Sequence, residues 1–433
     1  MQAEIEAMKV AFFKNVLIVT LLAMLGATAF AQADVHSPYS MFGVGQLADK
    51  SMNVRLKGMG GLANAMHGVG LANTGNPASY AKIDSLAFLF DAGFYFKNAT
   101  LSTSTNSERS SNASFDHVDM AFGLASWWKV AIGVQPYSTL GYKMVVDGLD
   151  ENAGGYQTTF EGAGGLNRVL LGNAFKIGKH FAVGVNANYV FGDSETVTTL
   201  LFPDSTYRMG TRRGTDLMVS SFKFDYGLMF DTKMGTDYHL SIGLTYDHPV
   251  KLGGKQTSFF RTIAGDSEVE YLIDTILYST HDTKLTMPQG IGFGVVLQKN
   301  KRWSVGADFN WTQWSKFARE GATDTLSDAW RVAVGAEFTP TYSSVSNYFR
   351  RASYRIGGFY EHTYLNINGI NLSKIGVSAG IAMPLPRTLS TVNLAVEVGR
   401  LGTKEASLVQ ESYFKLDVGI SVFEHWFMKR KYR

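Results

Sequence analysis

Most of the chain consists of segments in which apolar residues alternate with polar or small ones. In the segment from residue 85 to 101, one face carries Phe88, Phe90, Ala92, Phe94 and Phe96. The other face carries Leu89, Asp91, Gly93 and Tyr95. Strict alternation is typical of β-strands whose two faces meet different surroundings. About fourteen such segments follow one another down the chain, which predicts an all-β protein.

The length of these segments separates two architectures that both use alternating strands. A soluble β-sandwich turns its apolar face inward, whereas a membrane barrel turns that face toward lipid and its polar face toward a lumen. Many segments exceed about ten residues, which is longer than the roughly five or six usual in globular proteins and enough for a tilted strand to cross a bilayer. Aromatic residues also gather near segment ends, as in an interfacial girdle: Trp127, Trp128, Trp303, Trp311, Trp314, Tyr354, Tyr360, Tyr413 and Trp426. We therefore predict an antiparallel transmembrane β-barrel of about fourteen strands, with the sandwich as the alternative.

The start of the chain has the features of a secretory signal. Lys9 and Lys14 flank the beginning of a mostly apolar stretch, and Ala29-Phe30-Ala31 follows as a small-residue cleavage site. We predict a signal peptide over residues 1–31, a separate N-terminal segment over 32–84, the barrel over 85–427 and a basic periplasmic tail over 428–433. Such a barrel is expected in the outer membrane of a Gram-negative bacterium, in contact with membrane lipid and with both termini in the periplasm.

Nearly every predicted strand carries a glycine near its middle, on the face that also carries most of the charges. These glycines are Gly93, Gly123, Gly133, Gly172, Gly184, Gly227, Gly243, Gly292, Gly306, Gly335, Gly357, Gly376, Gly399 and Gly419. A glycine inside a strand costs about 0.5–1 kcal/mol relative to alanine. The glycines either ease the curvature of the barrel or clear space in the lumen for another part of the chain, and we favour the second role.

The segment before the first strand is rich in small residues and lacks apolar alternation. It contains the motif GMGG at 58–61 and, about fifteen residues later, NPASY at 76–80. An Asn-Pro pair marks a turn. We predict that this segment fits against the glycines and acts as a plug or gate through Gly58, Gly60, Gly61, Asn76, Pro77, Ala78, Ser79 and Tyr80.

These motifs, placed ahead of about fourteen alternating strands, resemble the long-chain fatty acid transporter (FadL-type) family of outer-membrane proteins. The stretches SPYS at 37–40, FGVG at 42–45 and GGLNRVLLGNAFKIGKHFAVG at 164–184 are similar to its Bacteroidota branch. The resemblance covers nearly the whole chain after the signal peptide.

The resemblance implies a 14-stranded barrel whose N-terminal segment folds into the lumen as a plug. It implies passive uptake of hydrophobic or amphipathic small molecules, fatty-acid-like or aromatic, which bind in an apolar luminal site. In that family an inward kink of one strand opens a lateral path into the bilayer. Only Asn76-Pro77-Ala78 can be matched residue by residue. Some members of the branch are implied to serve in outer-membrane assembly or secretion complexes, which leaves a structural subunit with outer-membrane protein partners as the alternative function.

Charged residues on the glycine face are predicted to line the lumen. They are Lys223, Asp225, Asp308, Arg331, Glu337, Arg355, Glu361, Glu397, Lys415 and Asp417. Ionisable groups at membrane depth are costly unless they face such an interior. Partners on one strand face are Lys223 with Asp225, Arg331 with Glu337, Arg355 with Glu361, and Lys415 with Asp417. These pairs either hold plug and wall together or form a polar track for the head group of an amphiphile.

The connections between segments predict the two ends of the barrel. Long outer loops are expected at 104–112, 147–156, 200–215 and 251–283, and short inner turns at 127, 178–180, 235–237 and 300–301. An even-stranded barrel with periplasmic termini alternates in this way. The connection over 340–350 is long for an inner turn, and the one at 368–369 is short for an outer loop.

Other functions find little support in the sequence. The chain has no Cys, a net charge of +3 and nine His, none with the spacing of a metal site. No Ser, His and acidic residue can be assigned to a catalytic arrangement. We therefore predict neither an enzyme nor a cofactor, and the charge gives no basis for a nucleic-acid partner.

Overall fold

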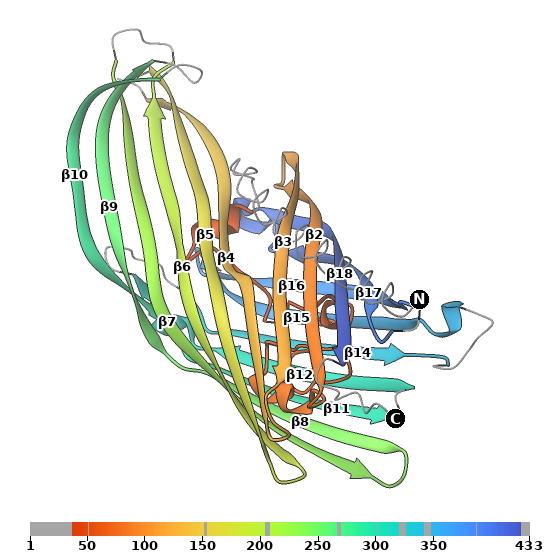
Figure 1. The fold of residues 1–433 in the computed structure, drawn as a ribbon. Coiled ribbons are helices and arrows are strands. Elements are labelled where there is room, and N and C mark those ends of the chain that lie inside the picture. The colour runs from red at the N-terminus through yellow and green to blue at the C-terminus, as the bar shows by residue number, and fades with distance from the viewer. Residues whose placement is uncertain are drawn as a thin grey trace, which may run out of the picture. The chain divides into compact units, whose positions relative to one another are not determined.

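The computed structural model describes residues 37–425, apart from 51, 151–153, 204–207, 266–269, 301, 320–325, 342–347 and 387. The predicted signal peptide, the first residues of the predicted N-terminal segment and the basic tail lie outside the described residues. Fourteen antiparallel wall strands close into a barrel, because the last strand, β18 (Gln410–His425), pairs with the first, β2 (Ala87–Ser102) (Figure 1). The prediction of a fourteen-stranded antiparallel barrel is therefore confirmed.

The wall follows the order of the chain, and each strand pairs with the next. Between β2 and β18 lie β3 (Ser107–Gly123), β4 (Trp128–Asp150), β5 (Gly154–Ile177), β6 (Phe181–Leu201), β7 (Gly210–Met234), β8 (Tyr238–Asp247), β9 (Val250–Gly265), β10 (Glu270–Met287), β11 (Gly290–Lys299), β12 (Trp303–Thr312), β14 (Ala329–Phe338), β15 (Ser353–Ile367), β16 (Ile370–Pro384) and β17 (Thr391–Leu401). β8 continues into β9, and β10 into β11, so each of these pairs makes one wall strand. The connections hold β13 (Ala318–Arg319), η4 (Trp314–Lys316), η5 (Tyr348–Arg350) and η6 (Glu405–Ser407).

The outer surface of the wall is apolar where the strands alternate. β11, β12 and β14 have ten residues each, and exposed side chains alternate with buried ones along them. Their exposed members include Ile291, Phe293, Val305, Phe309, Val332 and Val334. Ten residues in a tilted strand are enough to cross a bilayer, and an outward apolar face suits lipid. No helix in the described part of the chain is long and apolar enough to span a membrane.

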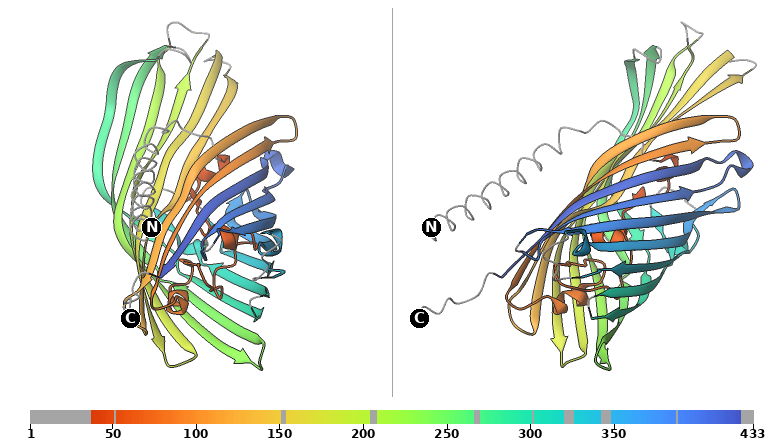
Figure 2. Two further views of the ribbon diagram at one scale, coloured as in Figure 1. Left: turned by 45° about the vertical axis from the view of Figure 1, so that its right-hand side comes forward. Right: turned by 90° about the vertical axis from the view of Figure 1, so that its right-hand side faces the viewer.

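One side of the wall rises well beyond the other (Figure 1, Figure 2). β5 and β7 have 24 and 25 residues, against ten in β8 and β11. The change occurs at Pro249, between β8 and β9, and at Pro288, between β10 and β11. Proline has no N–H to contribute to a ladder and therefore interrupts pairing. Above these breaks, the upper parts of β4, β5, β6, β7, β9 and β10 form an open sheet, which we call the tall sheet.

The tall sheet corrects the predicted loops. Most of the stretches 147–156, 200–215 and 251–283, expected to be long outer loops, are strands of this sheet. The predicted loop 104–112 was also too long, because β3 begins at Ser107. The first three loops were predicted wrongly because the strands of the tall sheet are rich in Thr, Ser and charged residues and meet solvent, so they show no apolar alternation. Backbone pairing and contacts such as that between the Thr257 and Thr280 hydroxyls, 3.0 Å apart, hold them together. The short turns at 178–180 and 235–237 are confirmed.

The N-terminal segment, Ser37–Leu86, lies inside the ring of strands. It contains η2 (Pro38–Met41), β1 (Gln46–Leu47), α2 (Val54–Lys57) and η3 (Pro77–Lys82). The Asn53 side chain caps α2 by accepting the Arg55 N–H, and Asn76 caps η3 by accepting the Ala78 N–H. α2 packs on β16, β17 and β18, whereas η3 packs on β4, β5, β6 and β7. The segment therefore reaches from one side of the lumen to the other.

Candidate functional site

The wall glycines form much of the surface on which the N-terminal segment rests. At eleven of the fourteen, an added Cβ would come within 4 Å of this segment: Gly93, Gly123, Gly172, Gly184, Gly227, Gly243, Gly292, Gly306, Gly335, Gly357 and Gly419. A Cβ on Gly335 would overlap the carbonyl oxygen of Met59, for example. At Gly133, Gly376 and Gly399 it would meet wall side chains instead. Most of these wall glycines therefore leave room for the N-terminal segment, which explains their positions better than the curvature of the barrel does.

The GMGG motif lies in close contact with the wall. Gly58 lies against the backbone of Gly380, and Gly60 and Gly61 have φ angles of +72° and +74°, which favour glycine. The Gly60 N–H donates to the Ser378 hydroxyl at 2.8 Å. The Arg331 guanidinium donates to the Gly60 carbonyl, also at 2.8 Å.

The NPASY motif supplies the N-cap and the first four residues of η3 and is buried. The Asn76 amide donates to the Asn64 carbonyl at 2.5 Å, and the Ser79 hydroxyl donates to the Asn73 carbonyl at 3.1 Å. The Tyr80 side chain has no exposed surface, and its hydroxyl donates to the Asn186 side chain at 3.2 Å. Pro77 and Ala78 come so close to the wall that Gly184 and Gly227 have no room for a Cβ. Small residues of the wall complete this contact: Ala131, Ala174 and Ala182.

The α2 end of the segment is held by buried ion pairs. The Lys57 ammonium lies 2.5 Å from the Asp116 carboxylate and 3.0 Å from that of Asp417, and its side chain is only 3% exposed. Burial alone would lower the pKa of Lys57, but these two carboxylates outweigh it and raise the pKa above its ordinary value. The Arg55 guanidinium pairs with Glu337 at 2.7 Å.

A bulge in β3 brings Asp116 to this cluster. The register of β3 against β2 shifts between the pairs Gly93–His117 and Phe94–Phe115, so Asp116 is the extra residue. As a result both Asp116 and His117 are buried, and His117 lies between the Asp116 and Asp91 carboxylates, at 2.9 and 2.5 Å. This group was not predicted from the sequence, because in an alternating strand one of two neighbouring residues is expected to face lipid. The available signal was the sequence Asp-His-Val-Asp at 116–119.

For two of the predicted ion pairs the structure shows a different partner, so these two predictions are wrong. Arg331 lies 3.8 Å from Glu361 rather than beside Glu337, and Arg355 lies 2.7 Å from Glu337 rather than beside Glu361. Both observed pairs join residues directly opposite each other on β14 and β15. Residues six apart along one strand are about 20 Å apart, whereas cross-strand neighbours are about 5 Å apart.

The other predicted wall residues also contact the interior. Lys223 pairs with Asp225, and Lys415 lies 3.4 Å from Asp417. The Asp308 carboxylate accepts the N–H groups of Ala63 and Asn64 at 2.6 and 2.8 Å. The Glu397 carboxylate accepts the hydroxyl of Tyr413 at 2.7 Å.

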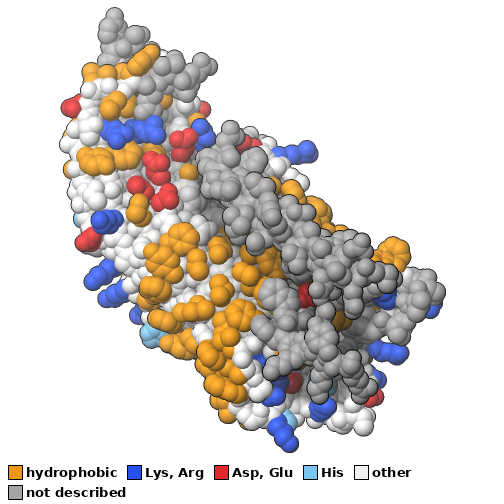
Figure 3. Space-filling view, in the orientation of Figure 1, with side chains coloured by type: hydrophobic (Ala, Val, Ile, Leu, Met, Phe, Trp, Pro, Cys, Tyr) orange, Lys and Arg blue, Asp and Glu red, His pale blue; other side chains and the backbone are white. Residues whose placement is uncertain are grey.

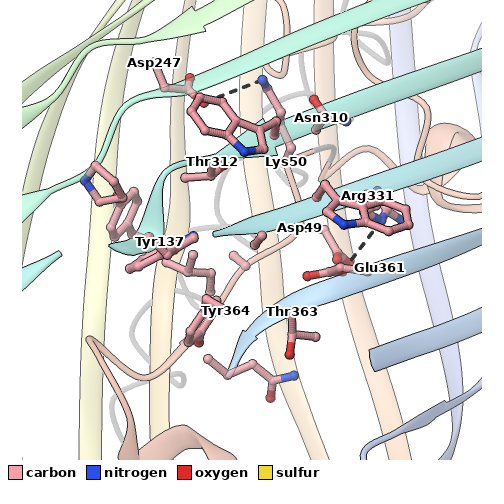
Figure 4. A pocket seen from close by; sticks show the side chains of 18 of the residues that line it. Asp49, Lys50, Tyr137, Asp247, Asn310, Thr312, Arg331, Glu361, Thr363 and Tyr364 are labelled. Carbon is pink, nitrogen blue, oxygen red and sulfur yellow. Dashed lines mark ion pairs between the residues drawn. The ribbon is translucent and has the colours of Figure 1, made fainter. Parts of the chain in front are cut away.

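Two cavities share part of their lining, a strip of the segment at Gln46–Asp49. The larger has a volume of about 270 Å³ and the smaller about 90 Å³, and the strip forms part of the lining of both. The larger combines aromatic side chains with charges (Figure 4). Tyr137 and Tyr364 face it together with the ion pairs Lys50–Asp247, at 3.6 Å, and Arg331–Glu361. Such a lining suits a molecule with both an apolar and a polar part.

The smaller cavity adjoins a gap in the wall. β3 and β4 pair only from Val118 to Gly123 and from Lys129 to Val134. Beyond this, β4 pairs with β1 of the strip, Thr139 with Gln46 and Ser138 with Leu47. Asp116 on β3 and Pro136 and Thr139 on β4 line the smaller cavity. The strip therefore stands between the larger cavity and the place where two wall strands separate.

A family model described as BamG matches residues 12–433. The chain belongs to the BamG family. No curated protein matches it. This BamG-family chain also shares its fold with solved structures that are described as transport barrels. A Pseudomonas putida toluene transporter, TodX, has a TM-score of 0.58 at 14% identity, covering 88% of this chain and 100% of its own.

Two further structures agree with this fold. A Pseudomonas aeruginosa FadL homologue has a TM-score of 0.56 at 12% identity, covering 88% of the BamG-family chain and 100% of its own. The Ralstonia pickettii toluene transporter TbuX has a TM-score of 0.55 at 14% identity, with 86% and 98% covered. The expected likeness to FadL-type barrels is confirmed at the level of the fold. Among the described residues, no group of three His, Asp or Glu side chains is placed to hold a metal ion.

Proposed function

We propose that this protein is an outer-membrane channel through which hydrophobic or amphipathic small molecules, fatty-acid-like or aromatic, pass without an energy source. The observation that carries the proposal is the position of the strip Gln46–Asp49, which lines both cavities and pairs with β4 where β3 leaves it. The hydrocarbon transporters of the same fold support a substrate of this class.

Gating by the N-terminal segment follows from the weak attachment of this strip. β1 contributes two pairs of residues to β4, and the neighbouring ion pairs Lys50–Asp247 and Asp49–Lys415 are both 3.6 Å long and partly exposed. Partly exposed ion pairs contribute about 0–1 kcal/mol each. Displacing the strip would join the two cavities and open a path between β3 and β4 toward the bilayer. The lateral path that the FadL resemblance implies would then lie at this gap.

A disulfide across the strip tests this gate, because the chain has no Cys of its own. Leu47→Cys and Ser138→Cys would place two thiols on directly opposed residues of β1 and β4. Uptake of radiolabelled toluene and of decanoate is measured in cells that lack the native chain. We expect the oxidised double variant to stop uptake and a reductant to restore it. A matched control, Val118→Cys with Val134→Cys, joins β3 to β4 below the gap and leaves the strip free.

The outcomes separate the parts of the proposal. Normal uptake through the oxidised Leu47–Ser138 variant would contradict gating by the strip. Uptake that is the same with and without the wild-type chain would contradict the channel itself. Equal loss in the oxidised control would mean that the wall, and not the strip, moves.

A structural subunit of an outer-membrane complex is the second candidate. The observation in its favour is the tall sheet. β5 and β7 have 24 and 25 residues, whereas ten residues, as in β11, are enough to cross a bilayer, so the sheet extends beyond the membrane-spanning part of the wall. Extraction of the membrane in mild detergent, followed by native mass measurement, tests it. A particle with the mass of the single chain would contradict this candidate.

A further inference from the structure

The connection between β14 and β15 lies against the outer face of the wall. Barrel strands are usually joined by short turns at this end, but here the connection spans 339–352 and contains η5. The Tyr354 side chain is 40% exposed, whereas the next residue, Arg355, is buried toward the lumen. The Tyr354 hydroxyl donates to the Phe349 carbonyl at 3.0 Å. η5 therefore adjoins the face of the barrel that meets lipid.

η5 extends a row of aromatic side chains at the ends of neighbouring strands. Trp303 begins β12 and lies opposite Phe338 at the end of β14, which lies opposite Tyr354 on β15. The Tyr238 ring, at the start of β8, is 6.1 Å from the Trp303 ring. η5 adds Phe349, which is 63% exposed. Aromatic rings gather where acyl chains meet head groups, so this row marks the level of the head groups.

Four cations border the aromatic row, and none of them forms an ion pair with a carboxylate of the described residues: Lys299, Arg302, Arg350 and Arg351. The Lys299 ammonium lies 5.1 Å from the centre of the Tyr238 ring, and the Arg351 guanidinium lies 5.5 Å from that of Tyr348. The buried Nε of Arg351 has no hydrogen-bond partner in the described part of the chain. A ring contact attracts a cation but does not neutralise it, so the four charges call for an anion.

Backbone hydrogen bonds bring cations from two connections to one place. The Thr339 N–H donates to the Arg302 carbonyl at 2.7 Å, and the Thr341 N–H donates to the Arg350 carbonyl at 2.9 Å. Thr339 and Thr341 are two residues apart, which is at most about 7 Å along the chain. The turn between β11 and β12 therefore lies beside η5. In Figure 3, Lys and Arg side chains are visible below the broad apolar part of the wall.

Charge and depth together indicate the chemistry of the ligand. A guanidinium group matches the geometry of a phosphate, and cations beside a membrane attract anionic lipids, each by about fivefold in affinity. The exposed rings of Tyr348 and Phe349 suit acyl chains rather than water. An anionic phospholipid meets both requirements with one molecule, because its head group carries the charge and its chains cover the rings.

We propose that η5 and the turn between β11 and β12 bind an anionic phospholipid of the leaflet at this end of the barrel, which is the periplasmic leaflet in the predicted orientation. Arg302, Arg350 and Arg351 contact its phosphate, and the rings of Tyr348 and Phe349 lie among the first carbons of its chains. The bound lipid holds the short-stranded side of the wall at the interface. The site is independent of transport, because none of these residues lines either cavity.

Lipid titration of the full chain in mild detergent, followed by native mass spectrometry, tests the site. Dioleoylphosphatidylglycerol is compared with dioleoylphosphatidylcholine, which has the same chains and a phosphate but no net charge. We expect the wild type to bind phosphatidylglycerol at least tenfold more tightly. The triple variant Arg302→Gln, Arg350→Gln, Arg351→Gln should lose this preference, and Arg350→Gln alone should weaken the binding about fivefold.

A matched control removes three exposed cations from the other end of the barrel and should keep the preference: Arg109→Gln, Arg213→Gln and Lys255→Gln. Equal affinity of the wild type for the two lipids would overturn the proposal, as would a preference that survives in the folded triple variant. Heat-modifiable mobility shows whether each variant is folded, and Arg350→Gln decides the matter if the triple variant is not.

Two further measurements separate a lipid from other anionic ligands. sn-Glycerol 3-phosphate should not displace phosphatidylglycerol at equal concentration, and displacement would overturn the proposal in favour of a free phosphate. p-Benzoylphenylalanine in place of Phe349 should form a phospholipid adduct in intact cells, and a protein adduct in its place would overturn the proposal in favour of a protein partner. The lipid titration requires no transport, so a failure of the channel proposal leaves its result unaffected.

Discussion

The two ends of the N-terminal segment are attached to the wall by different physics. The α2 end depends on charge: Lys57 joins Asp116 to Asp417, and Arg55 pairs with Glu337. The η3 end depends on shape, with Tyr80 buried among small residues and the Pro77 backbone against Gly184. Among the described residues, the one ion pair made by η3 is Lys82–Asp231 at 2.6 Å.

This difference bears on which end can move. A close steric contact loses its dispersion energy over less than an ångström, and η3 has such contacts with four strands. Charged groups that separate can be solvated by water, and the strip next to α2 already borders two cavities. We therefore propose that η3 is the anchor of the segment and that the strip Gln46–Asp49 is the part whose position changes.

The largest effect is expected when the charged end is broken at its centre. Lys57→Met removes the buried cation that joins Asp116 to Asp417 and leaves Asp116 with His117 and Asp417 with the more distant Lys415. This should destabilise the segment by about 3–5 kcal/mol. Hydrogen exchange measured by mass spectrometry should rise over residues 46–57 and change little over 77–82. Lys82→Met, whose ammonium is partly exposed, is the matched control. Equal exchange at both ends in Lys57→Met would contradict the division into two attachments.

The next effect should come from filling the space at the anchored end. Gly184→Val places a side chain where the Pro77 carbonyl lies, and overpacking of this kind costs about 1–3 kcal/mol. Limited proteolysis should then cleave the segment near η3 while the barrel keeps its heat-modifiable mobility. Gly253→Val is the control, because nothing lies within 4 Å of its Cβ position. An unchanged cleavage pattern in Gly184→Val would favour the curvature role of the glycines.

Two substitutions of Tyr80, the milder of which has a smaller effect, test whether the anchor depends on shape rather than polarity. Tyr80→Phe removes only the hydroxyl that donates to Asn186, at a cost of about 1 kcal/mol. Tyr80→Ala, which also removes the ring, should cost about 3–5 kcal/mol. Denaturant unfolding in micelles measures both. Equal losses in the two variants would show that the hydrogen bond, and not packing, holds η3.

The smallest effect concerns pH at the strip. Burial alone would raise the pKa of Asp49, but Lys415, with Lys374 and Lys57 beyond it, lowers that pKa below its ordinary value. A lowered pKa means that the stabilisation is complete above about pH 4 and is lost as the pH falls below that value. Asp49→Asn should cost about 1 kcal/mol or less and should flatten the acid-side rise in hydrogen exchange of residues 46–49. An identical pH profile in wild type and variant would contradict a role for this pair.

Much of the barrel could be predicted from the sequence, because each strand's alternation is a local property. Val332 and Val334 show a lipid-facing side without reference to any other strand, and the glycine row marks the opposite side. The luminal charges were found for the same reason. Their partners were not, since Arg331–Glu361 and Arg355–Glu337 depend on the register between β14 and β15.

The sequence by itself therefore determined the strand number, the two faces of the wall and the small-residue segment ahead of it. Only the tertiary structure decided that the bulge at Asp116 turns a second residue inward and that β1 pairs with β4 where β3 departs. It also decided that most of the stretch expected as a loop over 251–283 is a pair of strands, of which β10 has an edge that no other described residue pairs with over 271–282. The physical reason is the same in each case. A bulge, a gap and an edge are relations between strands, and no single strand's pattern of side chains records them.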